Sequence, residues 1–233
     1  MTEGLKPRIY LSKQEKIMRN FSMFFLALTI LFCLSVALFN ATFSVAEVSG
    51  GSMKPTLNYD IQKTDLVYYT NIFRATRGDI IIANPLNTKN DWIKRLIAVG
   101  GDTISFGDIN SEDEYYFYLN GQKLEENYLY SQDKNIDCVN RFKTMVRDCL
   151  NNPFGQNNLK REWLSQNENG KWQLKLPDDY CIYLGDNREG SNSYDCSFFG
   201  PQKKSTIVGK VMIVVPYGYD LLTYISAKFL GTV

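Results

Sequence analysis

Two residues in the sequence could act as a nucleophile and its base. Ser52 lies in a loop of small residues, Ser49-Gly50-Gly51-Ser52-Met53-Lys54-Pro55-Thr56-Leu57. Glycine permits tight turns and proline fixes its own φ, so such a loop can hold a serine hydroxyl exposed on a turn. Lys94 lies in an apolar segment, Asp91 to Val99, that two adjacent cations interrupt. A buried, neutral lysine could deprotonate a serine that attacks an amide.

The chain contains no histidine. A single chain of this sequence therefore cannot use Ser-His-Asp or Cys-His catalysis, or a histidine-ligated zinc ion. The bases that remain are a carboxylate or a lysine with a lowered pKa. Taken alone, a Gly-Gly-Ser segment is as typical of a flexible juncture, and most lysines lie on surfaces. The elements around Ser52 and Lys94 must decide between these readings.

Composition is that of a globular protein with one core. The 233 residues are 44% hydrophobic and 22% charged, which is enough apolar material for one domain. The 26 basic residues are nearly balanced by 25 acidic ones, for a net charge of +1. Since no basic stripe occurs beyond the N-terminus, we expect no nucleic-acid partner.

The N-terminal region has the pattern of a membrane anchor. Residues 1–20 are polar and rich in lysine and arginine, and the run from Phe21 to Phe39 carries no charge. At about 1.5 Å per residue this run can cross a hydrocarbon layer of about 30 Å. The cations before it predict an N-in orientation, with residues 1–20 cytoplasmic, 21–40 transmembrane and 41–233 outside. The alternative is a cleaved secretory signal ending near Ser44-Val45-Ala46.

The remainder of the chain is expected to be mainly β. Short runs rich in branched and aromatic residues predict strands at 65–69, 78–85, 91–99, 179–184 and 207–215, and a hairpin at 115–124 that turns at Asn120-Gly121. Residues 125–175 are more polar and are interpreted as an inserted, partly irregular subdomain. The spacing of apolar residues in 220–230 predicts a short amphipathic helix. Strand alternation places Lys94 and Arg95 on opposite faces, with Lys94 inward beside Leu96.

The cysteines are consistent with an exported domain. Cys33 falls in the apolar run, and the other four form an even set beyond it, where disulfides can persist. Proximity in the sequence favours the pairs Cys138 with Cys149 and Cys181 with Cys196. A zinc site made of four thiolates is the alternative, although the short paired spacing of zinc knuckles is missing. We therefore expect no metal and no cofactor.

Four segments resemble, in order and spacing, the sequence boxes of type I signal peptidases. They are GSMKPTL around Ser52, RGDIIIANP from Arg77, WIKRLIAVGGD from Trp92 and LGDNR from Leu184. The resemblance implies a signal-peptidase-type β-rich catalytic domain that cuts signal peptides from exported preproteins after Ala-X-Ala-like sites. By position, Ser52 matches the nucleophile and Lys94 the general base of a Ser/Lys dyad. It also implies an enzyme of the inner (cytoplasmic) membrane, in contact with lipid.

The resemblance is less complete for the supporting residues. Many Gram-negative members have an oxyanion-binding serine where this chain has Gly50, so the backbone N-H of Ser52 is the donor we expect. The family pattern after the LGDNR segment is stretched by two residues, so either Ser191 or Ser193 could orient Lys94, and Ser191 is favoured. Ser197 stands where the family has an arginine.

The substrate is expected to bind as an added strand. The edges predicted for this pairing are residues 78–85 and the approach to Ser52, and the residues predicted to contact substrate are Gly51, Met53, Ile80, Ile81 and Ile82. Two alternatives remain. One is a membrane-tethered β-rich binding domain without protease activity. The other is a self-cleaving repressor protease, which is disfavoured because a membrane span occupies the place of the DNA-binding domain.

Overall fold

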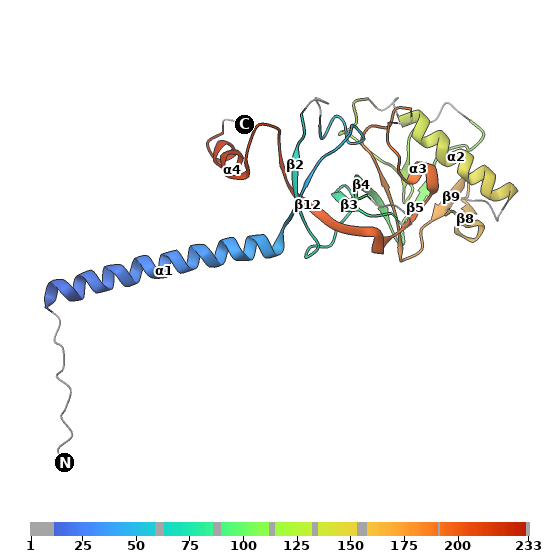
Figure 1. Ribbon diagram of the computed structural model, residues 1–233. Helices are drawn as coiled ribbons and strands as arrows, with labels where there is room; N and C mark the ends of the chain where they lie inside the picture. The colour runs from blue at the N-terminus through green and yellow to red at the C-terminus, as the bar shows by residue number, and fades with distance from the viewer. Residues whose placement is uncertain are drawn as a thin grey trace, which may run out of the picture. The chain divides into compact units, whose positions relative to one another are not determined.

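The computed structural model divides the chain into two compact units, residues 1–43 and residues 44–233. The structure describes residues 12–58, 63–85, 90–111, 115–131, 135–152, 158–190 and 192–231. Each unit is described by itself below. Figure 1 shows the first unit as a helix and the second as a body of strands and short helices.

The first unit is the helix α1, Lys13–Thr42. Ser12 caps its first turn, where the Ser12 hydroxyl accepts the Glu15 N-H at 3.3 Å and the Glu15 carboxylate accepts the Ser12 N-H at 2.7 Å. This reciprocal pair is a capping box, which starts a helix firmly. Among the described helices, α1 is the one long and apolar enough to cross a membrane. It begins several residues before the predicted span, because the polar flank from Lys13 continues the same helix.

The second unit contains two antiparallel sheets, so the prediction of a mainly β fold is confirmed. The seven-stranded sheet has the order β1 (Ser44–Glu47), β2 (Leu66–Thr70), β12 (Ile207–Val215), β3 (Ile80–Ala83), β4 (Trp92–Val99), β10 (Tyr180–Leu184) and β11 (Gln202–Lys203). The five-stranded sheet has the order β7 (Gln122–Lys123), β6 (Tyr118–Leu119), β5 (Thr103–Ser105), β9 (Trp172–Lys175) and β8 (Leu164–Gln166). The predicted hairpin is present as β6 and β7, with positive φ at Asn120 and Gly121.

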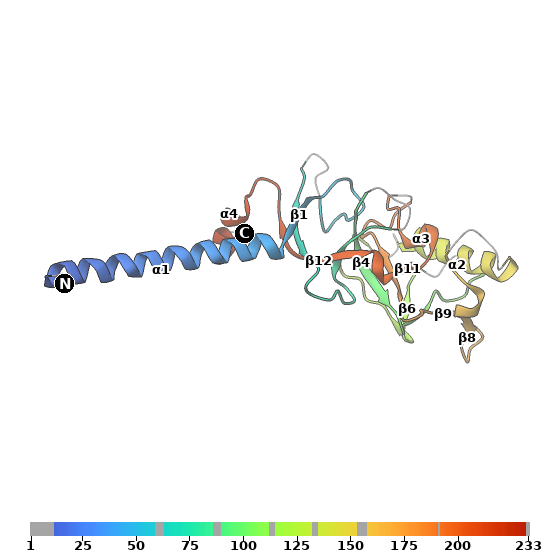
Figure 2. The same cartoon turned by 60° about the horizontal axis from the view of Figure 1, so that its bottom comes forward.

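The described part of this unit also contains the helices α2 (Ile136–Asn151), α3 (Cys196–Phe199) and α4 (Leu221–Phe229), with short 3-10 turns at Arg161–Trp163 and Lys204–Thr206. The predicted C-terminal helix is thus confirmed as α4. Figures 1 and 2 both place α2 beside α3, at the end of the unit that also holds β8 and β9.

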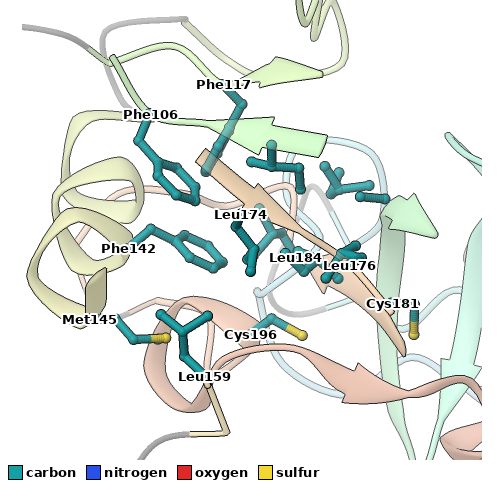
Figure 3. Close-up of a cluster of buried hydrophobic side chains, with 14 of the residues drawn as sticks. Phe106, Phe117, Phe142, Met145, Leu159, Leu174, Leu176, Cys181, Leu184 and Cys196 are labelled. Carbon is teal, nitrogen blue, oxygen red and sulfur yellow. The ribbon is translucent and has the colours of Figure 1, made fainter. Parts of the chain in front are cut away.

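The insertion is more regular than the sequence indicated. It contributes the whole of α2, and its strands β8 and β9 join the second sheet through β5. The buried residues of α2 recur at helical spacing: Cys138, Val139, Phe142, Met145, Val146 and Cys149. Figure 3 shows Phe142 beside Phe106, and the two stacked rings have their centres 5.2 Å apart. This segment is therefore part of the main core rather than a separate subdomain.

The predicted disulfides are wrong. The five cysteines are all free thiols, and the four in the second unit are buried. Cys138 and Cys149 lie on the one helix α2, where a rise of about 1.5 Å per residue separates them far beyond the reach of a disulfide. Cys181 lies in β10 and Cys196 in α3, and Figure 3 draws their side chains apart.

The predicted free edge at residues 78–85 is also wrong. β3 pairs with β12 on one side and with β4 on the other, so its backbone groups are already used. Among the described strands of this sheet, β1 and β11 are the terminal ones. β1 leads directly into the loop of Ser52.

Candidate active site

The side chains of Ser52 and Lys94 meet at a cavity of about 360 Å³. The amine nitrogen of Lys94 lies 2.9 Å from the hydroxyl oxygen of Ser52, and it donates a second hydrogen bond to the Ile93 carbonyl oxygen at 3.0 Å. Lys94 is only 4% exposed. Other residues that line the cavity are Ala46, Glu47, Val48, Ser49, Val67, Ile82, Asn90, Asp91, Trp92 and Ile93. The structure thus brings the two predicted residues together within hydrogen-bond distance.

Burial changes the acid-base chemistry of Lys94. Its pKa is lowered because the surrounding protein disfavours the charged form, although Asp195, Cys196 and Asp186 partly oppose this effect. A lowered pKa increases the neutral fraction of the amine at a given pH. A neutral amine can accept a proton from a serine hydroxyl, which a charged one cannot.

Hydrogen bonds from Asn58 and Asn187 to backbone carbonyl oxygens hold the loop of Ser52 in place. The side-chain amide of Asn58 donates to the carbonyl oxygens of Val48 and Gly50. Asn187 donates its side-chain N-H to the Gly51 carbonyl at 3.0 Å and its backbone N-H to the Ser52 carbonyl at 3.0 Å. Hydrogen bonds from both ends therefore fix a loop that carries two glycines.

Two glycines are required by this arrangement. Gly50 has φ +79°, a conformation that side chains rarely adopt. Gly185 follows β10, and a Cβ at this position would overlap the Ser193 hydroxyl and the Ser52 carbonyl. The close approach of the two loops therefore depends on glycine at position 185.

Beneath the loop lies a buried ion pair. Arg95 donates to both carboxylate oxygens of Asp186, at 2.8 and 2.5 Å, and Thr56 donates to the same carboxylate at 2.5 Å. Arg95 also donates to the Gly78 carbonyl at 2.7 Å. The prediction that Lys94 points inward holds, but Arg95 is only 8% exposed. Both faces of β4 are covered here, and Asp186 supplies the charge that makes burial of Arg95 tolerable.

The two candidate orienting serines have different outcomes. Ser191 lies outside the described residues. Ser193 is buried and donates to Asp195 at 2.6 Å, and Asp195 also accepts the Gly185 N-H at 2.9 Å. Among the described residues, the amine of Lys94 bonds Ser52 and Ile93 instead. Ser193 thus bonds Asp195, and no hydrogen bond joins it to the Lys94 amine among the described residues.

The predicted substrate contacts are divided between two environments. Ile82 lines the cavity, and Met53 and Ile80 pack in a small apolar cluster under the Ser52 loop. Ile81 is fully buried in the main core on the other side of β3. The expectation that Ile81 contacts substrate is therefore wrong, because adjacent strand residues face opposite ways. Gly51 is not among the residues that line the cavity, and its carbonyl oxygen accepts the hydrogen bond from Asn187.

Sequence reasoning assigned no role to Asn187 or Asp186, although both lie in the LGDNR segment. A run of polar residues directly after a buried strand was the available signal, because functional groups often lie on such loops. Sequence patterns also indicated no role for Glu126, whose carboxylate lies 2.5 Å from the guanidinium of Arg188. Both side chains are 1% exposed. That pair joins residues far apart in the sequence.

Comparison with known proteins identifies the family. The family model described as signal peptidase, peptidase S26, matches residues 19–216. The chain belongs to this signal peptidase family. It is 32% identical over 165 residues to signal peptidase I P of Bacillus subtilis subsp. natto, covering 70% of this chain and 71% of that protein. It is 31% identical over 181 residues to signal peptidase I of Bacillus caldolyticus, covering 77% and 82%.

More distant relatives agree in name. Signal peptidase I of Aquifex aeolicus is 29% identical over 191 residues, covering 72% of this chain and 73% of that protein. The crystal structure of a signal peptidase I from Enterococcus faecalis aligns with 61% of this chain and all of that chain, at 23% identity and a TM-score of 0.36. The family match over residues 19–216 and the curated relatives make the chain a membrane-anchored signal peptidase, a serine peptidase. The interpretation as a β-rich binding domain without activity is not favoured.

Proposed function

We propose that this signal peptidase removes N-terminal signal peptides from exported preproteins after Ala-X-Ala-like sites, with Ser52 as nucleophile and Lys94 as general base. The observation that carries the proposal is the 2.9 Å distance between the Lys94 amine and the Ser52 hydroxyl. This distance lies within the range for a nucleophile and its base. The absence of histidine from the sequence leaves lysine as the base that fits.

The proposed reaction proceeds in two stages. Neutral Lys94 takes the Ser52 proton as the serine oxygen attacks the scissile carbonyl carbon, and the backbone N-H of Ser52 stabilises the oxyanion. The Lys94 ammonium then gives its proton to the leaving amine, which departs with the mature protein. Water attacks the resulting acyl-enzyme ester with Lys94 again as base, and the signal peptide is released with a free carboxylate.

We infer that the substrate adds to β1 as a strand. β1 is a terminal strand of the described sheet, with β2 on one side. It continues into the loop of Ser52, and Ala46 and Glu47 of this strand line the same cavity as the catalytic pair. An extended peptide on this edge would place alternate side chains toward the cavity.

The proposed topology has the N-terminus inside and the catalytic unit outside the inner membrane. Support comes from Lys13, Lys16 and Arg19 before the apolar part of α1, since cations favour the cytoplasmic side. Residues 21–40 would contact lipid, and no nucleic acid is expected. Protease added to intact spheroplasts should digest the protein beyond residue 40 and spare residues 1–20. Protection of the C-terminal unit would reverse this orientation.

Cleavage of a preprotein tests the function directly. Full-length protein in detergent should cut a preprotein with an Ala-X-Ala site at that site, and Ser52→Ala protein should not. Intact wild-type protein that cuts none of several such preproteins between pH 6 and 10 would refute the proposal.

A further inference from the structure

The insertion contacts the loop after β10 at two places. The first is the buried pair of Arg188 and Glu126, which Asn135 completes by accepting a hydrogen bond from Arg188 at 2.8 Å. The second is the face of α2 that meets Gly190 and α3. The loop that carries Asp195 is therefore bounded by contacts to the insertion.

One turn of α2 holds both backbone groups of Gly190. The Asp137 carboxylate accepts the Gly190 N-H at 2.8 Å, and Arg141 donates to the Gly190 carbonyl at 2.7 Å. Residues four apart on a helix lie on the same face, so the two side chains act together. Arg141 also donates to the Ser197 hydroxyl at 2.9 Å, and its guanidinium lies 4.4 Å from the centre of the Phe198 ring.

The residue between these contacts is Asp195. Its carboxylate accepts the Ser193 hydroxyl at 2.6 Å and the Gly185 N-H at 2.9 Å, and it caps α3 by accepting the Ser197 N-H at 3.0 Å. Ser197 is thus bound by Asp195 through its amide and by Arg141 through its hydroxyl. A movement of Arg141 would be transmitted to Asp195 through a single residue.

We propose that Arg141, with Asp137, is a positioning residue for the reaction: from α2 it holds Gly190 and Ser197 so that Asp195 stays buried behind Lys94. The proposal rests on the proposed Ser52/Lys94 chemistry and gives the insertion a role in it. Asp195 is the neighbour that most opposes the effect of burial on the Lys94 pKa, which it raises. Among the described residues, the charged and titratable groups around Lys94 are Asp195, Cys196 and Asp186, which influence its pKa, and Glu47 and Asp91, which line the same cavity.

Loss of Arg141 should alter the base and not only the fold. Arg141→Met removes a cation that contacts Ser197, the residue whose N-H Asp195 accepts. With this positive charge gone, the negative charge of Asp195 acts on Lys94 with less compensation, which favours the charged amine and raises the Lys94 pKa. The acid limb of the rate profile should therefore move to higher pH.

The test compares two arginines of the same helix in full-length protein. Arg141→Met removes the contacts to the loop, whereas Arg147→Met removes hydrogen bonds to the Ile109 carbonyl and to Thr144, away from it. The rate of preprotein cleavage is measured from pH 6 to 10 together with the melting temperature. We expect Arg141→Met to shift the acid limb upward by about half a unit, which lowers kcat at pH 7 about threefold. Its rate should recover toward the wild-type value at high pH, and Arg147→Met should leave the limb in place.

A uniform loss of rate with an unmoved acid limb would show that Arg141 only supports the fold, and an unchanged rate would show that it is dispensable. Either result overturns the proposal. If Arg141→Met protein lacks a melting transition, Arg141→Gln, which also removes the charge, is judged by the shift of its acid limb. Arg141→Lys keeps the positive charge, so its acid limb should lie closer to that of the wild type than the limb of Arg141→Met does. The dyad itself is judged separately, since activity in Ser52→Ala or Lys94→Met protein would refute the proposed function whatever the Arg141 variants do.

Discussion

The side-chain amide of Asn187 donates a 3.0 Å hydrogen bond to the carbonyl oxygen of Gly51. That carbonyl and the Ser52 N-H belong to one planar trans peptide unit, in which they point in opposite directions. Because Asn187 holds the Gly51 carbonyl, the Ser52 N-H, which is the expected oxyanion donor, points away from Asn187. Polar residues after β10 thus control the orientation of the nucleophile's backbone.

Replacing Asn187 should consequently impair the chemical step. Asn187→Ala removes the bond to Gly51 but keeps the backbone bond to Ser52, so we expect kcat to fall about tenfold, as for one lost hydrogen bond, with KM little changed. Steady-state kinetics on a preprotein substrate measures both. Asn169→Ala, in the exposed β8–β9 turn, is the control. A rise in KM at constant kcat would instead assign Asn187 to substrate binding.

Ser52 and Lys94 should behave as one unit. Ser52→Ala and Lys94→Met should each abolish measurable cleavage, because the nucleophile and its base act in the same step. The double variant should be no slower than either single variant, since such losses are not additive. Single-turnover rates of the three proteins decide this, and a Lys94→Met enzyme near the wild-type rate would exclude the dyad.

Stability should depend on pH through Lys94. Its pKa is lowered from 10.5 by burial, so between the lowered value and 10.5 the unfolded chain binds more protons than the folded one. Lys94 therefore destabilises the fold at neutral pH, and the cost fades as pH rises toward 10.5. Lys94→Met should raise the melting temperature near pH 7, by an amount that shrinks toward pH 10. An equal or lower melting temperature at pH 7 would mean that the amine is solvated or paired.

The Asp186 carboxylate should be important for stability. Its side chain is 0% exposed and is bonded to Arg95 and Thr56. Asp186→Asn leaves the buried Arg95 without a counter-charge, which should cost about 3 kcal/mol in the free energy of unfolding. Asp178→Asn, at an exposed position, should change it by less than about 0.5 kcal/mol. Urea denaturation of the two proteins in the same detergent makes the comparison, and similar midpoints would contradict this role.

Local sequence patterns predicted most strands, because a strand and the turn that ends it depend mainly on the residue types within them. The strand at 207–215 agrees with β12, Ile207–Val215, and the turn at Asn120-Gly121 is present. The same patterns could not predict which strands lie at the edges of the sheet. Whether β3 is terminal depends on β12, a strand more than a hundred residues later, and no local feature records that pairing.

The helix α2 shows a different limit. Its polar composition suggested an irregular segment, yet its buried residues follow a helical period from Cys138 to Cys149. A periodicity count would have found it. The contacts of Arg141 with Gly190 and Ser197 could not have been found in this way, since they join segments about fifty residues apart.

The four buried thiols of the catalytic unit can report its unfolding, because they become reactive only when it opens. Burial raises the pKa of Cys138 and of Cys181 to about 12, and only thiolates react quickly with disulfide reagents. Labelling of Cys138, Cys149, Cys181 and Cys196 should therefore wait until the unit unfolds. In a Cys33→Ser protein, where the exposed thiol of α1 is gone, the labelling rate would report how often the catalytic unit unfolds while the protein remains in the membrane.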